Sequence, residues 1–303
     1  MLDRNTGLDR GFQLYDSPRG FQRDGAETTD RAIAWLKEAP NEAAFLWVHL
    51  YDAHMPYHPP AAFCPDEAAL QAARSEDDAN RRRRNGRIDG RDAAHLAEGK
   101  LLYAAEVAYV DALVGRLLDR LRPQDIVVAV ADHGESLDEQ GYFFNHGGLL
   151  HEPALHVPLI VRWSGVVAPN SRFDGIVATR DVAPMLLRAA GGSHTEGAVP
   201  LHETEVRSFT SGQQNRKGAA PASPALQKPK ASLRGSGFKV VATDENAVVY
   251  DLVADPGELS PQPVDPTRSG IALALETSLR GTVSPATADE QARLWALGYV
   301  EEN

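Results

Sequence analysis

The sequence predicts an α/β fold followed by a small C-terminal α+β subdomain. Two apolar runs, 44–50 and 126–131, have the composition of buried strands. Between them, residues 98–121 carry apolar side chains at spacings of three and four, which is typical of a long amphipathic helix. A strand, a long helical crossover and a second strand in this order indicate a parallel sheet with helices on its faces.

Local signals predict further elements on both sides of this core. A helix is expected to start at N-caps among Thr28, Thr29 and Asp30 and to end before Pro40. A third apolar strand is expected at 158–163. After another apolar run at 176–179, a helix over 181–190 is expected to stop at Gly191 and Gly192.

The last hundred residues have a different composition. Residues 208–236 are rich in Ser, Gly, Pro, Gln and Lys, and predict a flexible or irregular linker. A β-hairpin is expected from 238–242 and 247–252, followed by helices near 270–280 and 288–297. We therefore divide the chain into an α/β core at 1–200 and a region at 201–303 that holds the linker and the α+β subdomain.

Composition excludes several functional classes. The formal net charge of −11 over 303 residues argues against general nucleic-acid binding. The one basic cluster, Arg81–Arg84, follows acidic residues and lacks interleaved aromatic residues, so we interpret it as a solvated loop. No segment has the length and apolarity of a membrane span, and the first thirty residues have no signal-peptide pattern, so localisation stays open. Cys64 is the only cysteine, and we interpret it as an unreactive thiol.

Ionisable residues follow the two predicted core strands. Asp52, His54 and Tyr57 come after the first strand, and Asp132, His133 and Glu135 come after the second. If the strands are parallel neighbours, both clusters lie at one sheet edge, where α/β enzymes place their ligands. Asp132 and His133 are candidate ligands of a divalent cation, which would stabilise the charge of an anionic ester.

Other histidines are interpreted individually. His54 and His146, which stands in a second His-Gly pair, could hold the oxygens of the substrate or protonate its leaving group. His49, His151 and His156 are interpreted as ordinary hydrogen-bonding histidines.

These motifs, taken in order, resemble the sulfatases of the alkaline-phosphatase superfamily, including their phosphonate monoester hydrolase and choline-sulfatase relatives. The matching segments are Gly7–Asp16, Phe45–Pro60, Tyr103–Gly115, Asp132–Glu135, His146-Gly147, Tyr250–Glu258 and Leu297–Tyr299. The resemblance implies an α/β/α sandwich around a large mixed sheet, with a small C-terminal subdomain that contains a short antiparallel sheet.

The resemblance also implies roles for four residues. Asp132 and His133 match the downstream pair of metal ligands, and His54 matches a histidine that contacts the substrate. His146 stands where other members have a Lys or His that binds the sulfate and the leaving-group oxygen. Calcium is the metal in many members, while manganese or zinc suits the imidazole of His133 better.

Two family features are not in the sequence. There is no N-terminal pair of metal-binding Asp residues, and no Cys-x-Pro-Ser-Arg motif whose Cys or Ser becomes the formylglycine nucleophile. The chain is therefore expected to correspond to the C-terminal two-thirds of a sulfatase, with half of the metal site and no nucleophile. Losing the first third of a sulfatase should remove strands from the sheet, which is expected to expose strand edges and apolar faces.

Three functions fit these observations. The first is metal-dependent hydrolysis of a small sulfate ester by the complete form. The second is hydrolysis of a phosphonate or phosphate ester, because the same ligand pattern serves both anions. The third is a non-catalytic protein that binds a metal or an anion through the remaining Asp and His residues. The identity of the ester and the oligomeric state have no signature in the sequence.

Overall fold

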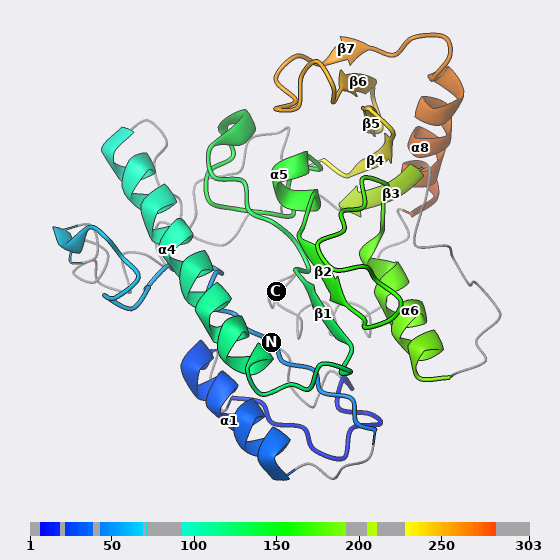
Figure 1. Ribbon diagram of the computed structural model, residues 1–303. Helices are drawn as coiled ribbons and strands as arrows, with labels where there is room; N and C mark the ends of the chain where they lie inside the picture. The colour runs from blue at the N-terminus through cyan, green and yellow to red at the C-terminus, as the bar shows by residue number, and fades with distance from the viewer. Residues whose placement is uncertain are drawn as a thin grey trace. The chain divides into compact units, whose positions relative to one another are not determined.

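A computed structural model describes residues 7–18, 22–38, 43–68, 71, 93–191, 205–210 and 228–282 (Figure 1). These residues belong to two compact units, with the main boundary between Pro123 and Gln124. Helices and antiparallel strands are both present, so the predicted α/β class is confirmed. The predicted division near residue 200 stays a prediction.

The elements have the following bounds. The helices are α1 (Gly25–Glu38), α4 (Ala93–Leu118), α5 (Glu152–Leu155), α6 (Val182–Ala189) and α8 (Ser269–Thr282), with 3-10 turns η2 (Glu139–Gly141) and η3 (Thr179–Asp181). The strands are β1 (Val127–Val130), β2 (Leu159–Arg162), β3 (Glu205–Thr210), β4 (Lys230–Gly235), β5 (Phe238–Ala242), β6 (Ala247–Asp251) and β7 (Gln262–Pro263). Within the described residues, no helix combines the length and apolarity that crossing a membrane requires.

In the first unit, α1 begins earlier than predicted. The Asp24 carboxylate accepts a hydrogen bond from the backbone N–H of Ala26 at 2.7 Å, so Asp24 satisfies one of the unpaired donors of the first turn. The predicted caps at 28–30 were therefore wrong, since these residues lie inside the helix. The start also requires Gly25, because a Cβ there would lie 2.4 Å from an oxygen of Asp52.

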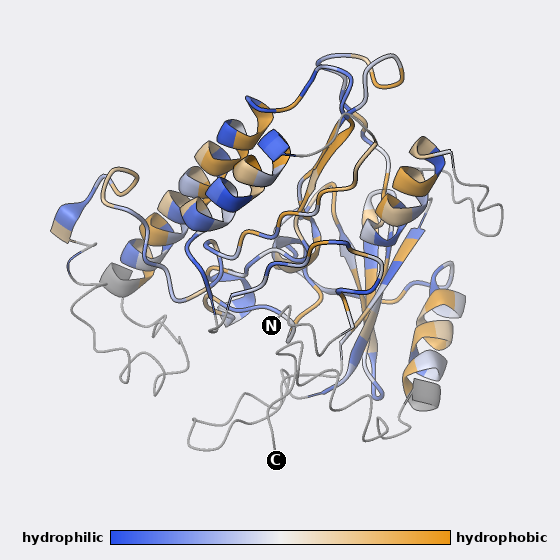
Figure 2. Cartoon of the chain, turned by 90° about the horizontal axis from the view of Figure 1, so that it is seen from below, coloured by the Kyte–Doolittle hydropathy of each residue, from blue (hydrophilic) through white to orange (hydrophobic). Residues whose placement is uncertain are grey.

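Helix α4 confirms the predicted amphipathic helix and extends it at its N-terminus. Leu102, Ala105 and Leu113 are buried, and the helix packs against α1. Figure 2 shows hydrophobic and hydrophilic residues interleaved along this long helix. The periodicity of three and four therefore predicted the helix and part of its buried face, since Val107 and Leu118 share the spacing but are exposed.

The predicted buried strand at 44–50 was wrong. Residues 43–50 have no regular secondary structure, and the side chains of Phe45 and Trp47 are 62% and 47% exposed. Both rings lie beside the ring of Phe12, at centroid distances of 5.8 and 6.4 Å. A strand needs a neighbour to pair its backbone groups. Among the described residues, no strand pairs with this segment.

In the second unit, the apolar runs 126–131 and 158–163 are strands β1 and β2. They form an antiparallel pair in which Val127 lies opposite Arg162 and Val130 opposite Leu159. The predicted parallel pairing is therefore corrected, because β1 pairs with β2 and the described residues contain no parallel ladder. Helix α6 confirms the helix predicted at 181–190.

The C-terminal sheet is larger than predicted. The hairpin of β5 and β6 is confirmed, and the sheet order is β3-β4-β5-β6-β7, with all neighbours antiparallel. The predicted linker at 208–236 was wrong in part, since it contains the end of β3 and all of β4. Pairing with β5 gives β4 its structure despite a linker-like composition. The predicted helix at 288–297 lies outside the described residues.

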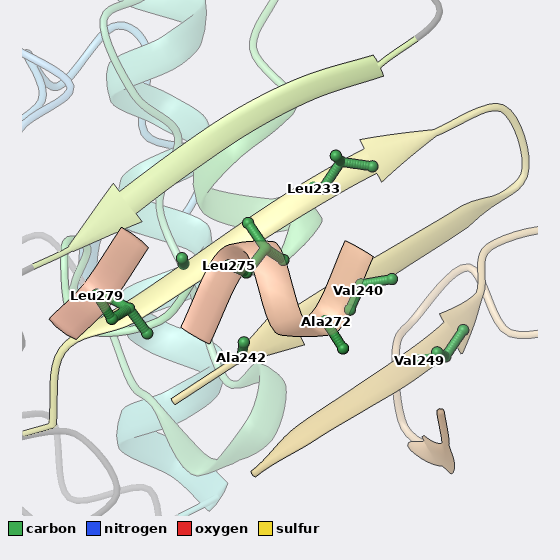
Figure 3. Packing of buried hydrophobic residues seen from close by; sticks show 8 residues of the cluster. Leu233, Val240, Ala242, Val249, Ala272, Leu275 and Leu279 are labelled. Atoms are coloured by element: carbon green, nitrogen blue, oxygen red, sulfur yellow. The ribbon is translucent and has the colours of Figure 1, made fainter. Parts of the chain in front are cut away.

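Helix α8 confirms the helix predicted near 270–280 and covers one face of this sheet. Figure 3 shows Leu275 and Leu279 of α8 against side chains of β4, β5 and β6. Leu233, Val240 and Leu275 are almost completely buried. This apolar core stabilises the sheet, whose residues also contact the loop that contains His146.

Candidate active site

Asp132 and His133 follow strand β1, separated from it only by Ala131. One carboxylate oxygen of Asp132 accepts a hydrogen bond from the backbone N–H of His133 at 3.0 Å. The other oxygen lies 3.8 Å from Nε2 of His133. The Asp132 side chain is 65% exposed and that of His133 is 30% exposed, so both are accessible from solvent.

The hydrogen bond of the His133 ring determines its tautomer. Nδ1 lies 2.8 Å from the backbone carbonyl of Gly134, and a carbonyl oxygen can only accept. Nδ1 therefore donates, and the neutral ring carries its lone pair on Nε2. This second interaction orients the ring in the way that metal-binding histidines are commonly oriented.

His146 lies beside this pair. Its ring stacks on that of His133, with a centroid distance of 3.8 Å and an interplanar angle of 25°. Nδ1 of His146 lies 3.3 Å from a carboxylate oxygen of Glu135, whose side chain is only 6% exposed. The structure therefore brings together Asp132, His133 and His146, three of the four predicted site residues, with Glu135 as an orienting group.

Backbone contacts hold the two His-Gly segments together. Ser136 and Asn145 exchange backbone hydrogen bonds at 3.0 and 3.2 Å, which closes the chain between them into a loop. The N–H of Gly134 donates to the carbonyl of Ala154 at 2.8 Å. A Cβ at Gly134 would lie 2.0 Å from the carbonyl oxygen of Pro153, so this position requires glycine.

Tyr142 fixes the backbone of the His146 loop, and the sequence reasoning did not single it out. Its hydroxyl donates to the carbonyl of His146 at 2.6 Å and accepts from the N–H of Gly148 at 3.1 Å. The side chain is almost fully buried, at 3% exposure. A tyrosine four residues before a histidine has no fixed structural meaning, so no local signal could have identified this contact.

His54, the fourth predicted site residue, belongs to the first unit. Its Nδ1 lies 2.7 Å from the carbonyl of Met55, so Nδ1 donates, and its ring stacks on Tyr51 at 4.5 Å. His54 thus has the same tautomer as His133. His54 lies in the first unit, whereas the residues after β1 lie in the second. That His54 lies close to these residues therefore stays a prediction.

Buried acids surround the start of α1 in the first unit. Burial is the main cause that raises the pKa of Glu106 to about 7, and the charges of Asp52 and Asp24 add to it. Burial also raises the pKa of Asp52. Burial and the hydrogen bond to Asp24 raise the pKa of Tyr109 to about 12. Glu106 lies on the buried stripe of α4, and a glutamate within an apolar periodicity was the signal that could have singled it out.

The three histidines interpreted as ordinary have different surroundings. His151 is buried, and Nε2 lies 3.3 Å from the hydroxyl of Tyr250. Burial, followed by the charges of Lys239 and Lys230, lowers the pKa of His151 to about 4, so its ring is neutral near neutral pH. His156 is exposed beside Glu152, and His49 lies near Tyr51. None of these interactions requires a ligand.

The donor atoms of Asp132 and His133 fit one cation as two ligands. Two ligand atoms bound at about 2.0–2.2 Å and separated by 110–120° are roughly 3.3–3.8 Å apart, and the distance between Asp132 Oδ2 and His133 Nε2 is 3.8 Å. No group of three or more His, Cys, Asp or Glu residues in the described part of the chain could hold a metal ion. The two residues therefore supply an incomplete set of ligands.

The family of the chain follows from a comparison with known proteins. The sulfatase family model matches residues 7–193, which include both His-Gly segments and His54. The chain belongs to the sulfatase family. The resemblance of its ordered motifs to sulfatases is thereby confirmed.

Individual sulfatases are similar to parts of the chain. The choline-sulfatase of Rhizobium meliloti (strain 1021) is 27% identical over 230 residues, which are 67% of this chain and 42% of that protein. The N-acetylglucosamine-6-O-sulfatase of Bacteroides thetaiotaomicron is 28% identical over 173 residues, which cover 52% of this chain and 31% of that protein. The chain thus spans less than half the length of these sulfatases.

Solved structures show the same fold. A protein solved with its substrate D-glucosamine-2-N,6-O-disulfate has a TM-score of 0.56 at 17% identity, over 85% of this chain and 69% of that one. A second, from a study of glycosaminoglycan metabolism in Bacteroides thetaiotaomicron, has a TM-score of 0.58 at 16% identity, over 85% and 58%. The α/β fold is therefore that of sulfatases.

Proposed function

We propose that this chain is the metal- and anion-binding part of a sulfuric ester hydrolase that acts on a small sulfated substrate. The observation that carries the proposal is the stacking of His133 on His146 beside Asp132, inside the region that the sulfatase family model matches. The pair places a candidate metal ligand next to a candidate ligand of the sulfate group. The names of its relatives, which include choline-sulfatase and N-acetylglucosamine-6-O-sulfatase, support sulfate over phosphonate.

Each residue has a role in this proposal. Asp132 and His133 would hold a divalent cation, calcium by family or manganese or zinc by ligand type, and the cation would stabilise negative charge on the ester oxygens. Nδ1 of His146 is engaged with Glu135, so Nε2 is the nitrogen that would hold a sulfate oxygen or protonate the leaving group. His54, with Nδ1 on the carbonyl of Met55, would contact the substrate through Nε2.

The nucleophile is not part of the 303 residues, because the sequence contains no Cys-x-Pro-Ser-Arg motif. Cys64 is buried and its thiol donates to the carbonyl of Asp66 at 3.2 Å, so it does not fill that role. The chain by itself is therefore proposed to bind the metal and the anion without turning over the ester. Complete sulfatase activity would need the nucleophile and further metal ligands.

The first test is calorimetry of the chain with calcium, manganese and zinc. We expect weak binding that Asp132→Ala and His133→Ala both remove. Asp174→Ala is the matched control, since Asp174 is an exposed aspartate of the same unit that pairs with Arg172. Binding that survives both site substitutions would contradict the proposed metal site.

The second test is turnover of an aryl sulfate and of the matched phosphonate ester. We expect negligible rates on both, because the nucleophile is missing. Robust metal-dependent turnover of the sulfate would contradict the proposed division of roles, and preference for the phosphonate would favour the alternative hydrolase. Sub-micromolar metal binding that depends on Asp132, without sulfate binding, would favour a non-catalytic metal-binding protein.

A further inference from the structure

Three side chains of the C-terminal sheet donate hydrogen bonds to the loop that follows His146. Thr210 of β3 donates through its hydroxyl to the carbonyl of Gly147. Lys230 of β4 donates to the carbonyl of Gly148 at 3.1 Å. Lys239 of β5 donates to the carbonyl of Leu150 at 3.2 Å. Three successive strands of the sheet therefore contact three carbonyls of one short loop.

Sheet register explains why Thr210 and Lys230 act together. They are directly opposite each other in the antiparallel pair of β3 and β4. Cross-strand partners on one face of a sheet lie about 4.5–5.5 Å apart at Cβ. The pair can therefore reach the adjacent carbonyls of Gly147 and Gly148 from one place on the sheet.

The loop has little freedom to rearrange between these contacts. Gly147 has a φ of +79°, which favours glycine. A Cβ at Gly148 would lie 2.8 Å from the hydroxyl of Tyr142, the group that also binds the carbonyl of His146. Tyr142 on one side and the sheet on the other therefore fix the backbone directly after His146.

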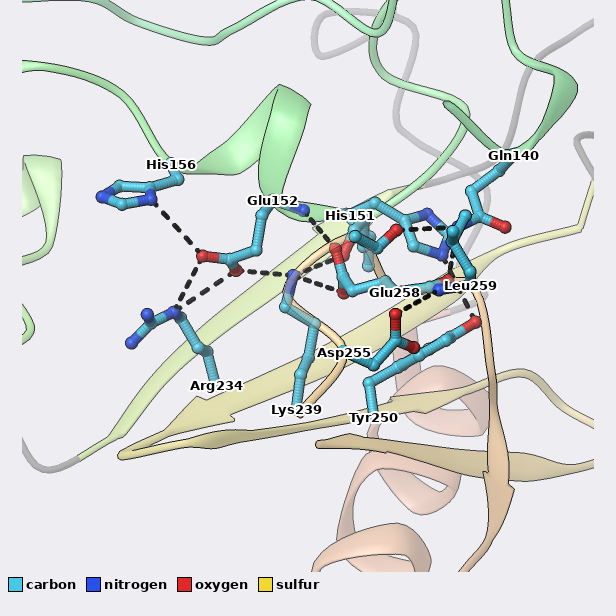
Figure 4. A network of polar contacts seen from close by, with 12 residues as sticks. Gln140, His151, Glu152, His156, Arg234, Lys239, Tyr250, Asp255, Glu258 and Leu259 are labelled. Carbon is cyan, nitrogen blue, oxygen red and sulfur yellow. Dashed lines mark hydrogen bonds and ion pairs between the residues drawn. The ribbon is translucent and has the colours of Figure 1, made fainter. Parts of the chain in front are cut away.

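The two lysines differ in their charge partners. Figure 4 shows the Lys239 ammonium between Glu152 and Glu258, at 2.7 and 2.9 Å from their oxygens. Lys230 is 6% exposed, and no described carboxylate forms an ion pair with it. The Lys230 ammonium also donates a hydrogen bond to the carbonyl of Lys228 at 3.1 Å. Burial lowers the pKa of Lys230, which agrees with a buried ammonium that has no carboxylate partner in the described part of the chain.

We propose that Thr210 and Lys230 are positioning residues for His146, and that the buried ammonium of Lys230, which pairs with no carboxylate among the described residues, favours an anion at this loop. The inference rests on the proposed function, in which His146 holds a sulfate oxygen. A buried ammonium that pairs with no carboxylate among the described residues is costly even when carbonyls accept its hydrogen bonds, so its retention next to the His146 loop indicates a use that packing alone does not give. The ligand class is an oxyanion such as sulfate.

The test is a titration of the isotope-labelled 303-residue chain with inorganic sulfate, followed by NMR at the His146 ring and the amides of Gly147 and Gly148. The variants are Lys230→Met, which keeps length and removes charge, and Thr210→Val, which removes only the hydroxyl. The control is Lys228→Met, because Lys228 pairs with Glu245 through its side chain.

Both site variants are expected to move the signals of His146, Gly147 and Gly148 before any sulfate is added. Lys230→Met should also weaken sulfate binding about tenfold, the order of effect expected from removing one nearby positive charge, and Lys230→Arg should restore part of it. Lys228→Met should change neither. If Lys230→Met does not fold, Thr210→Val still decides whether the sheet positions the loop.

The two proposals fail in different ways. If the wild-type chain binds no sulfate, the anion role of His146 is contradicted, while the signal changes without sulfate still decide the positioning role. If the wild type binds sulfate and both variants keep wild-type loop signals and affinity within twofold, the positioning role of Thr210 and Lys230 is overturned.

Discussion

The ring of His133 stacks on the ring of His146 at a centroid distance of 3.8 Å. Each ring has its own orienting acceptor, the Gly134 carbonyl for His133 and the Glu135 carboxylate for His146. Because the rings are in direct contact, an event that fixes the orientation of one ring also constrains the other. The candidate metal ligand and the candidate anion ligand are therefore mechanically coupled.

This stacking predicts that metal binding is visible at His146. We expect zinc to shift the ring signals of both histidines in the wild-type NMR spectrum. In His133→Ala the shift at His146 should disappear, while His156→Ala, which changes an exposed histidine beside Glu152, should leave it unchanged. A zinc-dependent shift confined to His133 in the wild type would contradict the coupling.

The raised pKa of Glu106 predicts that the free energy of unfolding falls as the pH rises. Its pKa is raised from 4.5 to about 7, so the folded state binds its proton more tightly than the unfolded state does. The contribution is complete below pH 4.5 and is lost as the pH rises through 7. The difference corresponds to on the order of 3 kcal/mol. Chemical denaturation of Glu106→Gln across this range should show a flatter profile and a higher unfolding free energy than wild type at pH 8.

The amide of Gln can keep the acceptor for the backbone N–H of His58, which Glu106 binds at 2.6 Å. Glu38→Gln, at the exposed end of α1, is the control and should not change the profile. Parallel pH profiles for wild type and Glu106→Gln would show that Glu106 is ionised normally in the folded chain.

His151 predicts the opposite pH dependence. Its pKa is lowered from 6.5 to about 4 by burial and by Lys239 and Lys230, so its stabilising contribution is complete above pH 6.5 and is lost as the pH falls to 4. The change corresponds to on the order of 3 kcal/mol. His151→Gln should have a flatter unfolding profile between these values. If the unfolding free energy of His151→Gln falls with acid as steeply as that of wild type, groups other than His151 cause the loss.

Gly134 predicts a steric effect on the site. In Gly134→Ala the new Cβ would meet the Pro153 carbonyl at 2.0 Å, so the backbone next to His133 must shift. We expect a loss of about 1–3 kcal/mol in unfolding free energy and weaker zinc binding. Gly115→Ala is the control, because nothing lies within 4 Å of its Cβ and Gly115 is inside α4. That substitution should stabilise the chain by about 0.5–1 kcal/mol.

The buried ion pair of Lys239 and Glu258 predicts a large loss of stability when its cation is removed. Both Lys239 and Glu258 are 0% exposed at the side chain. Lys239→Met leaves the Glu258 carboxylate without its cation, and we expect a loss of about 3–5 kcal/mol in unfolding free energy. The double variant Lys239→Met/Glu258→Gln should lose less than the sum of the single variants. Additive losses in this cycle would show that the two charges do not interact.

The spacing of apolar residues and the positions of turn-forming residues predicted the elements whose structure depends on residues nearby in the sequence. Helix α4, the β5-β6 hairpin and α8 were confirmed because spacings of three and four, or two apolar runs around a short turn, are patterns of residues close together in the sequence. The predicted cap of α1 was wrong, since Asp24 accepts hydrogen bonds earlier in the chain than Thr28 does. A choice between neighbouring caps depends on contacts such as that of Gly25 with Asp52.

Part of the candidate site could also be predicted from the sequence. The ordered motifs identified Asp132, His133 and His146 before their proximity was known, and the structure brings these three together. Tyr142, Thr210 and Lys230 could not be predicted, because their roles depend on backbone carbonyls that are distant in sequence or presented only by a folded loop.

The sequence by itself determined the family, the α/β class and the chemical types of the site residues, because these depend on residue identity and on spacing along the chain. Tertiary structure decided the strand pairing: the apolar run at 44–50 lacks a described partner, while the linker-like residues 230–235 form β4 between β3 and β5. A strand exists only when another backbone satisfies its hydrogen bonds, and that neighbour is a property of the folded chain.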